Sequence, residues 1–338
     1  MLYCARSIQK IEKAAIASGV TGFEMMQKAG AIVFAELQNH WPDAKAVSVF
    51  CGTGNNGGDG FVVATLASLA GLEVSVYCIG AVSTLKDEAK SAFNALKETN
   101  AKLMDFDQSL VIDADVVVDA LCGIGLKGAP RKVFLDVFDV INDADIGVLA
   151  VDIPSGLNAD SGYVAEEAVI ADVTVTFIAE KPGLFTGDGP DFAGSVMMHD
   201  LDLSDEVLSA ADPDVDVFSA QELNEILPPR IKNIHKGQVG HVLVIGGHAG
   251  MSGAPVLSAL GALRVGAGLV SLGTHPDHAS LVNINQPEMM SHAIADEKAL
   301  IPLLEKASVL VLGPGLGRTP WSEALFQTSL AADLPTVI

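Results

Sequence analysis

Acidic, amide and hydroxyl side chains follow three apolar runs of this sequence, at the points where predicted strands end. The stretch GTGNNGGDG (52–60) follows the run AVSVFC and combines two asparagines with Asp59. Asp119 ends the run VVVD, and Asp152 and Ser155 follow GVLAV. Oxygen donors of these kinds bind alkali or alkaline-earth cations, and a carboxylate can act as a general acid or base. We therefore predict one site in which Asp152 does the acid-base work and Asp119 faces an ion.

The glycines of the first loop also fit the pattern G-x-G-x-x-G, at Gly52, Gly54 and Gly57. In a dinucleotide-binding loop such glycines allow a tight turn and a close approach of the backbone to a pyrophosphate. That fingerprint also expects an acidic residue about 20 positions further on, at the end of the next strand. Glu73 has this spacing but begins its predicted strand, which weakens the prediction of an ordinary NAD site. A plain glycine-rich turn remains an alternative, and each aspartate taken singly is compatible with a helix cap or a turn.

Strand-like and helical segments alternate through the first 200 residues and must position these side chains. Apolar runs predict strands at 46–51, 73–80, 115–121, 147–153 and 172–178. Apolar residues at helical spacing predict helices within 7–37, 61–71 and 85–100. Strands that are apolar on both faces are typical of a parallel sheet covered by helices on both sides. Because parallel strands open their carboxyl ends at one edge, the asparagines, aspartates and Ser155 are expected to face one crevice.

Composition limits the classes of protein to which the chain can belong. It has 338 residues, of which 49% are hydrophobic and 18% charged, so it can bury two cores. Its formal net charge of −22 argues against nucleic-acid phosphate as a partner. The glycine loops and their polar side chains make a small-molecule substrate the expected partner. The chain opens with no signal-peptide pattern, and no apolar run approaches the roughly 20 residues that span a bilayer. These features predict a soluble cytoplasmic protein.

Cysteine and histidine chemistry is not favoured by the spacing of these residues. The four cysteines form no C-x-x-C pair and are expected to be reduced, buried small side chains: Cys4, Cys51, Cys78 and Cys122. The motif IPSGL differs from a G-x-S-x-G nucleophile elbow and has no histidine nearby, which argues against a serine hydrolase. His275 and His278 have i,i+3 spacing, but Pro276 between them predicts a loop without a metal.

A second α/β pattern follows an acidic stretch in the middle of the chain. Residues 202–217 are rich in aspartate and contain Pro213, which predicts a linker between domains at 1–215 and 216–338. Residues 235–274 read as a strand, a glycine loop, a helix and another strand, and ASVLVLGPGLGRT (307–319) adds a strand with a glycine turn. The last run, LPTVI, reads as a central strand.

Three ordered motifs of the first half resemble those of the NAD(P)H-hydrate epimerase family, the YjeF N-terminal domain. They are GTGNNGGDG, DALCGIGLKG and VDIPSGLNADSG, with TFIAEKPGL after them. The resemblance covers about the first 200 residues. It implies a Rossmann-like three-layer α/β/α fold. It also implies an enzyme that interconverts the S and R epimers of NADHX and NADPHX, the hydrates of NADH and NADPH.

This resemblance also implies roles for individual residues. The first substrate loop corresponds to Asn55, Asn56, Gly57, Gly58 and Asp59. The second substrate loop corresponds to Gly123, Ile124, Gly125, Leu126, Lys127, Gly128 and Ala129. Asp152 is a further substrate contact and our candidate catalytic residue. The ligands of a potassium ion correspond to Asn56, Asp119 and Ser155.

The second half resembles the start of the ADP-dependent NAD(P)H-hydrate dehydratases, a ribokinase-like family. The likeness covers about 218–338 and implies that Ala254 and Gly315 or Gly317 touch the hydrate. It also implies ADP or ATP with Mg²⁺ as the co-reactant. The family's catalytic Asp, in a G-T-G-D type loop, has no counterpart up to Ile338. We therefore expect an incomplete, C-terminally truncated dehydratase domain without dehydratase activity.

Two other functions remain open at the level of sequence. The epimerase fold also serves as a scaffold domain in RNA-decapping factors, although the acidic charge and the intact aspartates argue against that use. Ribokinase-like domains can also phosphorylate small alcohols, which makes a small-molecule kinase the alternative for the second half. A homo-oligomer is expected in either case.

Overall fold

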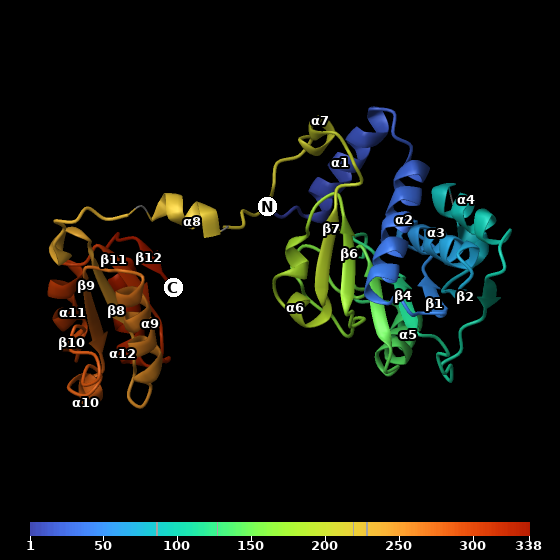
Figure 1. Cartoon of the computed structure of the whole chain (residues 1–338). Helices are drawn as coiled ribbons and strands as arrows, with labels where there is room; N and C mark the ends of the chain where they lie inside the picture. Colours follow the sequence, from blue (N-terminus) through green and yellow to red (C-terminus); the bar gives the residue numbers. More distant parts are fainter. Residues whose placement is uncertain (86, 127, 219, 228) are drawn as a thin grey trace. The chain divides into compact units, whose positions relative to one another are not determined.

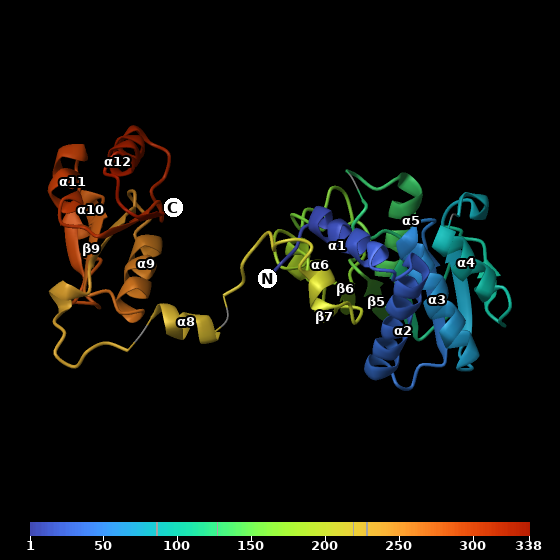
Figure 2. The ribbon, with the colours of Figure 1, turned by 90° about the horizontal axis from the view of Figure 1, so that it is seen from above.

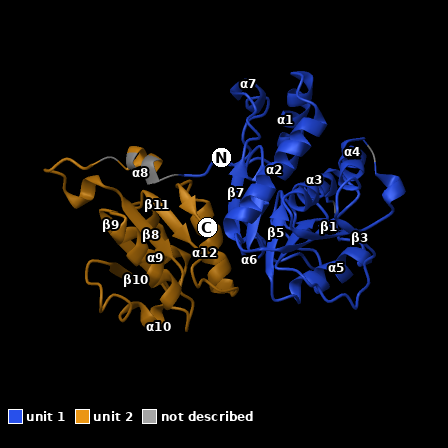
Figure 3. Ribbon diagram, turned by 45° about the vertical axis from the view of Figure 1, so that its right-hand side comes forward, with its two compact units in different colours: residues 1–219 blue, residues 220–338 orange. Residues whose placement is uncertain are grey.

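The structure is a computed structural model that describes residues 1–85, 87–126, 128–218, 220–227 and 229–338. It divides into two compact units, Met1–Ser219 and Ala220–Ile338 (Figures 1 and 3). Each unit has its own parallel sheet. No helix within the described ranges is long and apolar enough to cross a membrane.

The first unit contains a seven-stranded, fully parallel sheet in the order β3-β2-β1-β4-β5-β6-β7. Its strands are β1 (Ala46–Cys51), β2 (Glu73–Cys78), β3 (Lys102–Met104), β4 (Val116–Ala120), β5 (Gly147–Val151), β6 (Val173–Phe177) and β7 (Ser195–His199). The five predicted strands are confirmed, whereas β3 and β7 were not predicted. The strand order reverses between β1 and β4, which is where ligands bind in open parallel sheets.

Helices cover both faces of this sheet, which confirms the predicted Rossmann-like three-layer fold. They are α1 (Ala5–Ala17), α2 (Gly22–His40), α3 (Asn55–Leu69), α4 (Asp87–Leu96), α5 (Lys132–Asn142), α6 (Gly189–Phe192) and α7 (Asp205–Leu208). Helices α1 to α4 pack on one face, where Val116 and Val118 point, and α5 packs on the other, where Val117 points. In Figure 2, α2 and α3 lie side by side along the first face.

The predicted helical stretch 7–37 is two helices because its middle has strong end signals. Gly19, just after α1, has a positive φ of 105° that glycine adopts without strain. Thr21 then caps α2: its hydroxyl accepts from the Glu24 N–H (3.1 Å), and the Glu24 carboxylate accepts from the Thr21 N–H (2.8 Å). This capping box fixes the residue at which α2 begins, and residues of both helices border the same pocket.

Helix α3 begins earlier than predicted, inside the glycine motif. Asn55 is its first residue and Gly54 its N-cap, so that residues 55–58 form a helical turn and not a loop. A Cβ on Gly52 would lie 2.0 Å from the Leu121 carbonyl oxygen, and one on Gly57 would lie 1.9 Å from the Gly52 carbonyl oxygen. Two glycines are therefore required here by the close approach of the β1 and β4 loops to the start of α3.

The expected linker 202–217 is wrong over most of its length. Leu203, Val207 and Ala211 are buried in the core of the first unit, and residues 205–208 form α7. Val215 pairs with Leu2 in an isolated antiparallel bridge. The buried apolar residues of this stretch are separated by acidic residues, so the sequence did not indicate that they pack into the core of the first unit.

The second unit has a five-stranded parallel sheet in the order β10-β9-β8-β11-β12. Its strands are β8 (His241–Ile245), β9 (Leu269–Thr274), β10 (Met290–Ala293), β11 (Val309–Leu312) and β12 (Thr336–Val337). Its helices are α8 (Ala220–Ile226), α9 (Gly253–Arg264), α10 (Pro276–Ala279), α11 (Glu297–Leu304) and α12 (Pro320–Leu330).

One expectation for the second unit is wrong. Residues 276–279 form α10 and not a loop, because proline is favoured in the first turn of a helix, where its missing N–H is not needed. The final run LPTVI contains the predicted strand, β12, which pairs with β11.

We predict that Gly57→Ala lowers the free energy of unfolding of the first unit by about 1–3 kcal/mol, since the new methyl group forces the backbone apart. Gly125→Ala is the control, because a Cβ there meets nothing within 4 Å. Thermal unfolding should give a melting temperature several degrees lower for Gly57→Ala alone. Equal melting temperatures for the two variants would show that the close approach at Gly52 is not rigid.

Candidate active site

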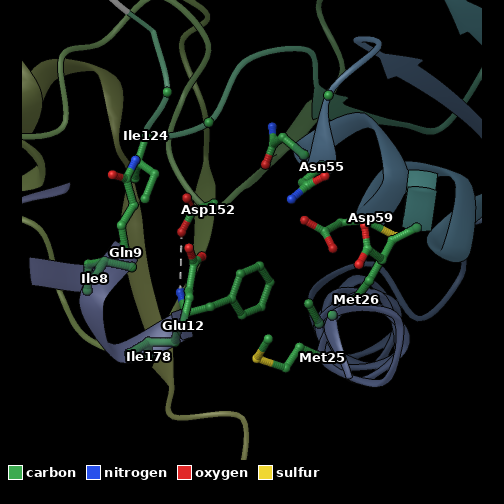
Figure 4. Close-up of a pocket in the computed structure, with 18 of the residues that line it drawn as sticks. Ile8, Gln9, Glu12, Met25, Met26, Asn55, Asp59, Ile124, Asp152 and Ile178 are labelled. Atoms are coloured by element: carbon green, nitrogen blue, oxygen red, sulfur yellow. Dashed lines mark hydrogen bonds between the residues drawn. The ribbon is translucent and has the colours of Figure 1, made fainter. Parts of the chain in front are cut away.

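A cavity of about 550 Å³ lies at the carboxyl edge of the first sheet (Figure 4). Its walls come from α1, α2, the start of α3, the loop after β4 and the ends of β5 and β6. Eight predicted residues line it: Asn55, Asn56, Asp59, Gly123, Ile124, Gly125, Leu126 and Asp152. Figure 4 shows Asp152 and Glu12 on one side of the pocket, with Asn55 and Asp59 on the other.

The other predicted residues of this unit lie around the cavity. Gly57 and Gly58 are buried in the first turn of α3, and Gly128 and Ala129 are exposed beyond the described lining. Lys127 lies outside the described residues. Asp119 and Ser155 are fully buried next to the loop that follows β4.

Asp119 and Ser155 form a hydrogen-bonded pair that joins the ends of β4 and β5. The Ser155 hydroxyl donates to Oδ1 of Asp119 (2.6 Å), and the Ser155 N–H donates to Oδ2 (2.7 Å). The Cys122 N–H donates to the Ser155 hydroxyl (2.8 Å), and this bond connects the start of the second glycine loop to the pair. Burial raises the pKa of Asp119 from 3.8 to about 6, although the bonds from Ser155 and Leu121 oppose this. A cation beside this carboxylate would favour its charged form.

Asn56 is the observation that supports a cation site here. Its Nδ2 atom is buried without a hydrogen-bond partner, and its side chain lies beside Gly123, where a Cβ would be 3.2 Å from Oδ1. Amide nitrogen and oxygen are assigned from hydrogen bonding, so the reversed side chain would offer an oxygen at the orphaned position. An amide, a hydroxyl and one carboxylate suit a monovalent cation. No group of three His, Cys, Asp or Glu side chains suited to a metal occurs in the described part of the chain.

Asp152 is paired with Lys181, a residue that the sequence did not single out. The Lys181 Nζ lies 2.6 Å from Oδ1 of Asp152, and the lysine side chain has no exposed surface, whereas 14% of the Asp152 side chain is exposed. Lys181 follows β6 and reaches back to the end of β5. The carboxylate in the pocket wall is therefore held by a buried counter-charge, with one side open to the cavity.

Two further carboxyl groups face the same cavity. Burial raises the pKa of Glu12, and the charge of Asp152 adds to this while Lys181 opposes it. Burial also raises the pKa of Asp59 well above its usual range, with smaller contributions from Asp152 and Glu12. The pocket thus combines one ion-paired carboxylate with two carboxyl groups that retain protons more readily than usual. Differences in environment that move the pKa values of similar groups apart allow one group to act as an acid and another as a base.

Sequence reasoning missed Glu12 as well as Lys181. Glu12 lies on α1, whose apolar residues were recognised, and no motif marks this glutamate. The quoted motif TFIAEKPGL contains Lys181, but nothing local indicates that its side chain turns inward.

Thiol chemistry is not supported at this site. Cys122 lines the cavity, and burial next to Asp119 raises the pKa of its thiol to about 12. A neutral thiol is a weak nucleophile. All four cysteines are free, although only Cys51 is fully buried as expected.

The second unit has a similar arrangement where its strand order reverses, between β8 and β11. The Gly247 N–H donates to the Pro314 carbonyl (3.0 Å), and the His248 N–H donates to the Gly315 carbonyl (2.7 Å). A Cβ on Gly317 would contact His248, and Ala254 is exposed in the first turn of α9, which follows the β8 loop. The segments that carry the three predicted residues therefore lie at the carboxyl edge of this sheet.

Two family models match the chain. The one described as "YjeF-related protein N-terminus" matches residues 22–183, and the one described as "NAD(P)H-hydrate dehydratase" matches residues 242–338. The crystal structure of the yeast protein Ynu0 superposes on 65% of this chain and 97% of its own, with a TM-score of 0.55 and 20% identity. At this identity the likeness shows the fold of the first unit.

Curated relatives match both units together. The bifunctional NAD(P)H-hydrate repair enzyme of Coxiella burnetii is 43% identical over 338 residues, which are 100% of this chain and 69% of that protein. The enzyme of the same name from Escherichia coli is 38% identical over 331 residues, 96% of this chain and 63% of that protein. The chain thus spans about two thirds of the length of these relatives.

We predict that Asp119 makes the protein less stable as the pH rises from about 4 to 7 in potassium-free buffer. Its pKa is higher in the folded state, so the unfolded chain loses this proton at lower pH. The stability difference between wild type and Asp119→Asn should therefore fall by roughly 2 kcal/mol over this range. Denaturant unfolding at several pH values measures this difference. A difference that is flat or rises with pH would contradict the buried, poorly compensated charge.

Proposed function

Because the chain belongs to the family of bifunctional NAD(P)H-hydrate repair enzymes, we propose that its first unit interconverts the S and R epimers of NADHX and NADPHX. This membership confirms the resemblance found in the motifs. The observation that supports the proposal most strongly is Asp152, an ion-paired carboxylate open to a cavity at the reversal of strand order. The cavity volume of about 550 Å³ is large enough for a nucleotide-sized part of a ligand.

The walls of the cavity suit the two chemical parts of a dinucleotide. The first turn of α3, with Asn55 and Asn56, offers free backbone N–H groups, which attract phosphate oxygens. Met25 and Ile178 give an apolar surface on the side of the pocket away from Asn55, against which a ring can pack. We therefore propose that phosphates bind near α3 and that the hydrated nicotinamide ring lies near Asp152.

Epimerisation inverts the carbon that carries the hydroxyl group and leaves the atom count unchanged. A proton must leave the substrate and return, so the site needs a base and a proton donor. We propose that Asp152 accepts the hydroxyl proton as the carbonyl forms and the bond from this carbon to the ring nitrogen breaks. Asp59 or Glu12, whose raised pKa favours the protonated form, can donate to the nitrogen. Reclosure on the other face reverses both transfers.

We further propose that Asn56, Asp119 and Ser155 hold a potassium ion. The orphaned amide of Asn56 and the buried carboxylate of Asp119 support this assignment. The ion would supply a fixed positive charge that stabilises the Asp119 carboxylate and fixes the two glycine loops next to it. Proton transfer would remain the work of the carboxyl groups in the cavity.

For the second unit we propose the binding of the same hydrates at Ala254, Gly315 and Gly317, within a dehydratase that uses ADP or ATP with Mg²⁺. The match to the dehydratase family model supports this function in preference to that of a small-molecule kinase. The activity of the whole protein, a preference between NADHX and NADPHX, and a cytoplasmic homo-oligomer stay predictions.

We predict that Asp152→Asn reduces epimerisation by about 10²–10⁴-fold, because the amide cannot take up a proton. Asn keeps an oxygen for Lys181, so hydrate binding by calorimetry should change little. Chromatography of the S and R hydrates measures the rate, and Asp105→Asn, at an exposed position after β3, is the control. A near-normal rate in folded Asp152→Asn would remove this residue from the mechanism.

We predict that potassium stabilises the wild-type protein more than sodium or choline at equal ionic strength. A ligand that binds only the folded state adds about 2.7 kcal/mol at 100 times its Kd. Asn56→Ala should lose the potassium-specific rise in melting temperature, whereas Asn100→Ala, at an exposed position, should keep it. Identical effects of the three cations on the wild type would refute the assignment without reference to activity.

A further inference from the structure

Lys181 has no exposed surface, yet all three of its ammonium protons have acceptors. Its Nζ lies 2.6 Å from Oδ1 of Asp152, 2.8 Å from Oγ1 of Thr176 and 2.9 Å from the carbonyl oxygen of Phe177. An ammonium group has three donors, so this geometry is complete. The lysine is therefore held in one orientation by groups from two neighbouring strand ends.

These two strand ends share a rare backbone geometry. Asp152 has a φ of +68° and is enclosed by a hydrogen bond from the Ile153 N–H to the Val151 carbonyl (2.8 Å). Ile178, with a φ of +69°, is enclosed in the same way by a bond from Ala179 to Phe177 (2.8 Å). Such three-residue γ-turns with a positive φ are strained, and a β-branched isoleucine rarely adopts this conformation. Strain of this kind persists only where surrounding contacts impose it.

The ammonium group connects the two turns. It binds the side chain at the centre of the first turn, Asp152, and the carbonyl that opens the second, Phe177. The Thr176 hydroxyl also lies 3.4 Å from Oδ1 of Asp152. The direction in which the carboxylate faces the cavity is thus set by Lys181 and by both strained turns together.

We propose that Lys181 is a positioning residue of this site, which holds Asp152 as an oriented, charged base by joining the γ-turns that end β5 and β6. The proposal rests on the proposed function of Asp152 and deepens it. Lys181 lies behind Asp152 and is absent from the described lining of the cavity, so it acts through the carboxylate and does not touch the substrate.

The charges around Asp152 make this role necessary. Glu12 from α1 and Asp59 from α3 line the same cavity as Asp152, and both are negative when ionised. Lys181 counteracts this repulsion, as its lowering effect on the pKa of Glu12 indicates. Without the ammonium group that bonds Asp152, three carboxyl groups would share the cavity, and each ionised group would disfavour ionisation of the others.

The test is the pH dependence of epimerisation in Lys181→Met, which keeps the length of the side chain and removes the charge. We expect the acid limb of the kcat profile to move up by at least about one pH unit, with at least a tenfold loss at the pH where the wild type is half-maximal. KM should change little, and alkaline pH should restore part of the rate. Lys90→Met, at an exposed position of α4, should leave the profile unchanged.

A double-mutant comparison separates positioning from folding. In the Asp152→Asn background, Lys181→Met should cause no further loss of activity, because the residue through which it acts is gone. Loss of rate without a shift of the acid limb, or equal further loss in this background, would mean that Lys181 only stabilises the fold. Should Lys181→Met fail to fold, Thr176→Val carries the same test, with a smaller shift in the same direction expected and an unmoved limb as the contradicting result.

A measurement without substrate distinguishes failure of this proposal from failure of the proposed function. Carbon NMR of the labelled Asp152 carboxyl group should show protonation at higher pH in Lys181→Met, or in Thr176→Val, than in the wild type. An inactive wild type with this shift would overturn the epimerase function and retain the pairing. An active wild type whose Asp152 titration is unchanged in the variants would overturn the role of Lys181.

Discussion

The ion pair between Lys181 and Asp152 connects the sheet of the first unit to its chemistry. Burying a lysine costs free energy that a single ion pair does not reliably return, so stability alone is a poor reason for its presence. Here the ammonium group makes three hydrogen bonds, two of them to oxygens at strained strand ends, and charge-assisted bonds are the stronger kind. The geometry of the pair indicates that it orients one carboxylate toward the cavity.

The two buried aspartates at this edge show how the same side chain is given different properties. Asp119 lies among hydrogen-bond donors from Ser155 and Leu121, without a described cationic side chain bonded to it, and its pKa rises to about 6. Asp152 has an ammonium partner and an opening to the cavity. One position therefore suits a bound cation, and the other suits proton transfer. The reversal of strand order between β1 and β4 gives both groups their space.

The sequence predicted the strands and the aspartates well because both carry local signals. Five apolar runs became strands, and Asp119 and Asp152 lie at strand ends as expected. The start of α3 was missed because glycines and asparagines are typical of loops, although here close backbone packing selects the glycines. The short strands β3 and β7 have largely exposed or half-buried residues and so lack an apolar run.

Contacts between distant segments had no such signal. Glu12 approaches Asp152 through the packing of α1, and Lys181 through a turn that follows the neighbouring strand. Neither approach can be inferred from spacing. The burial of Leu203 and Val207 was likewise hidden among acidic residues.

The central claim is that the carboxylate paired with Lys181 contacts the hydroxyl group on the reacting carbon of a hydrated nicotinamide. The most direct measurement is a crystal structure of Asp152→Asn soaked with the S hydrate of NADH. Our account predicts the ring hydroxyl within hydrogen-bond distance of the residue 152 side chain, with the phosphates at the start of α3. A dinucleotide bound with its adenine at this position, or with the hydrated ring outside the cavity, would contradict it.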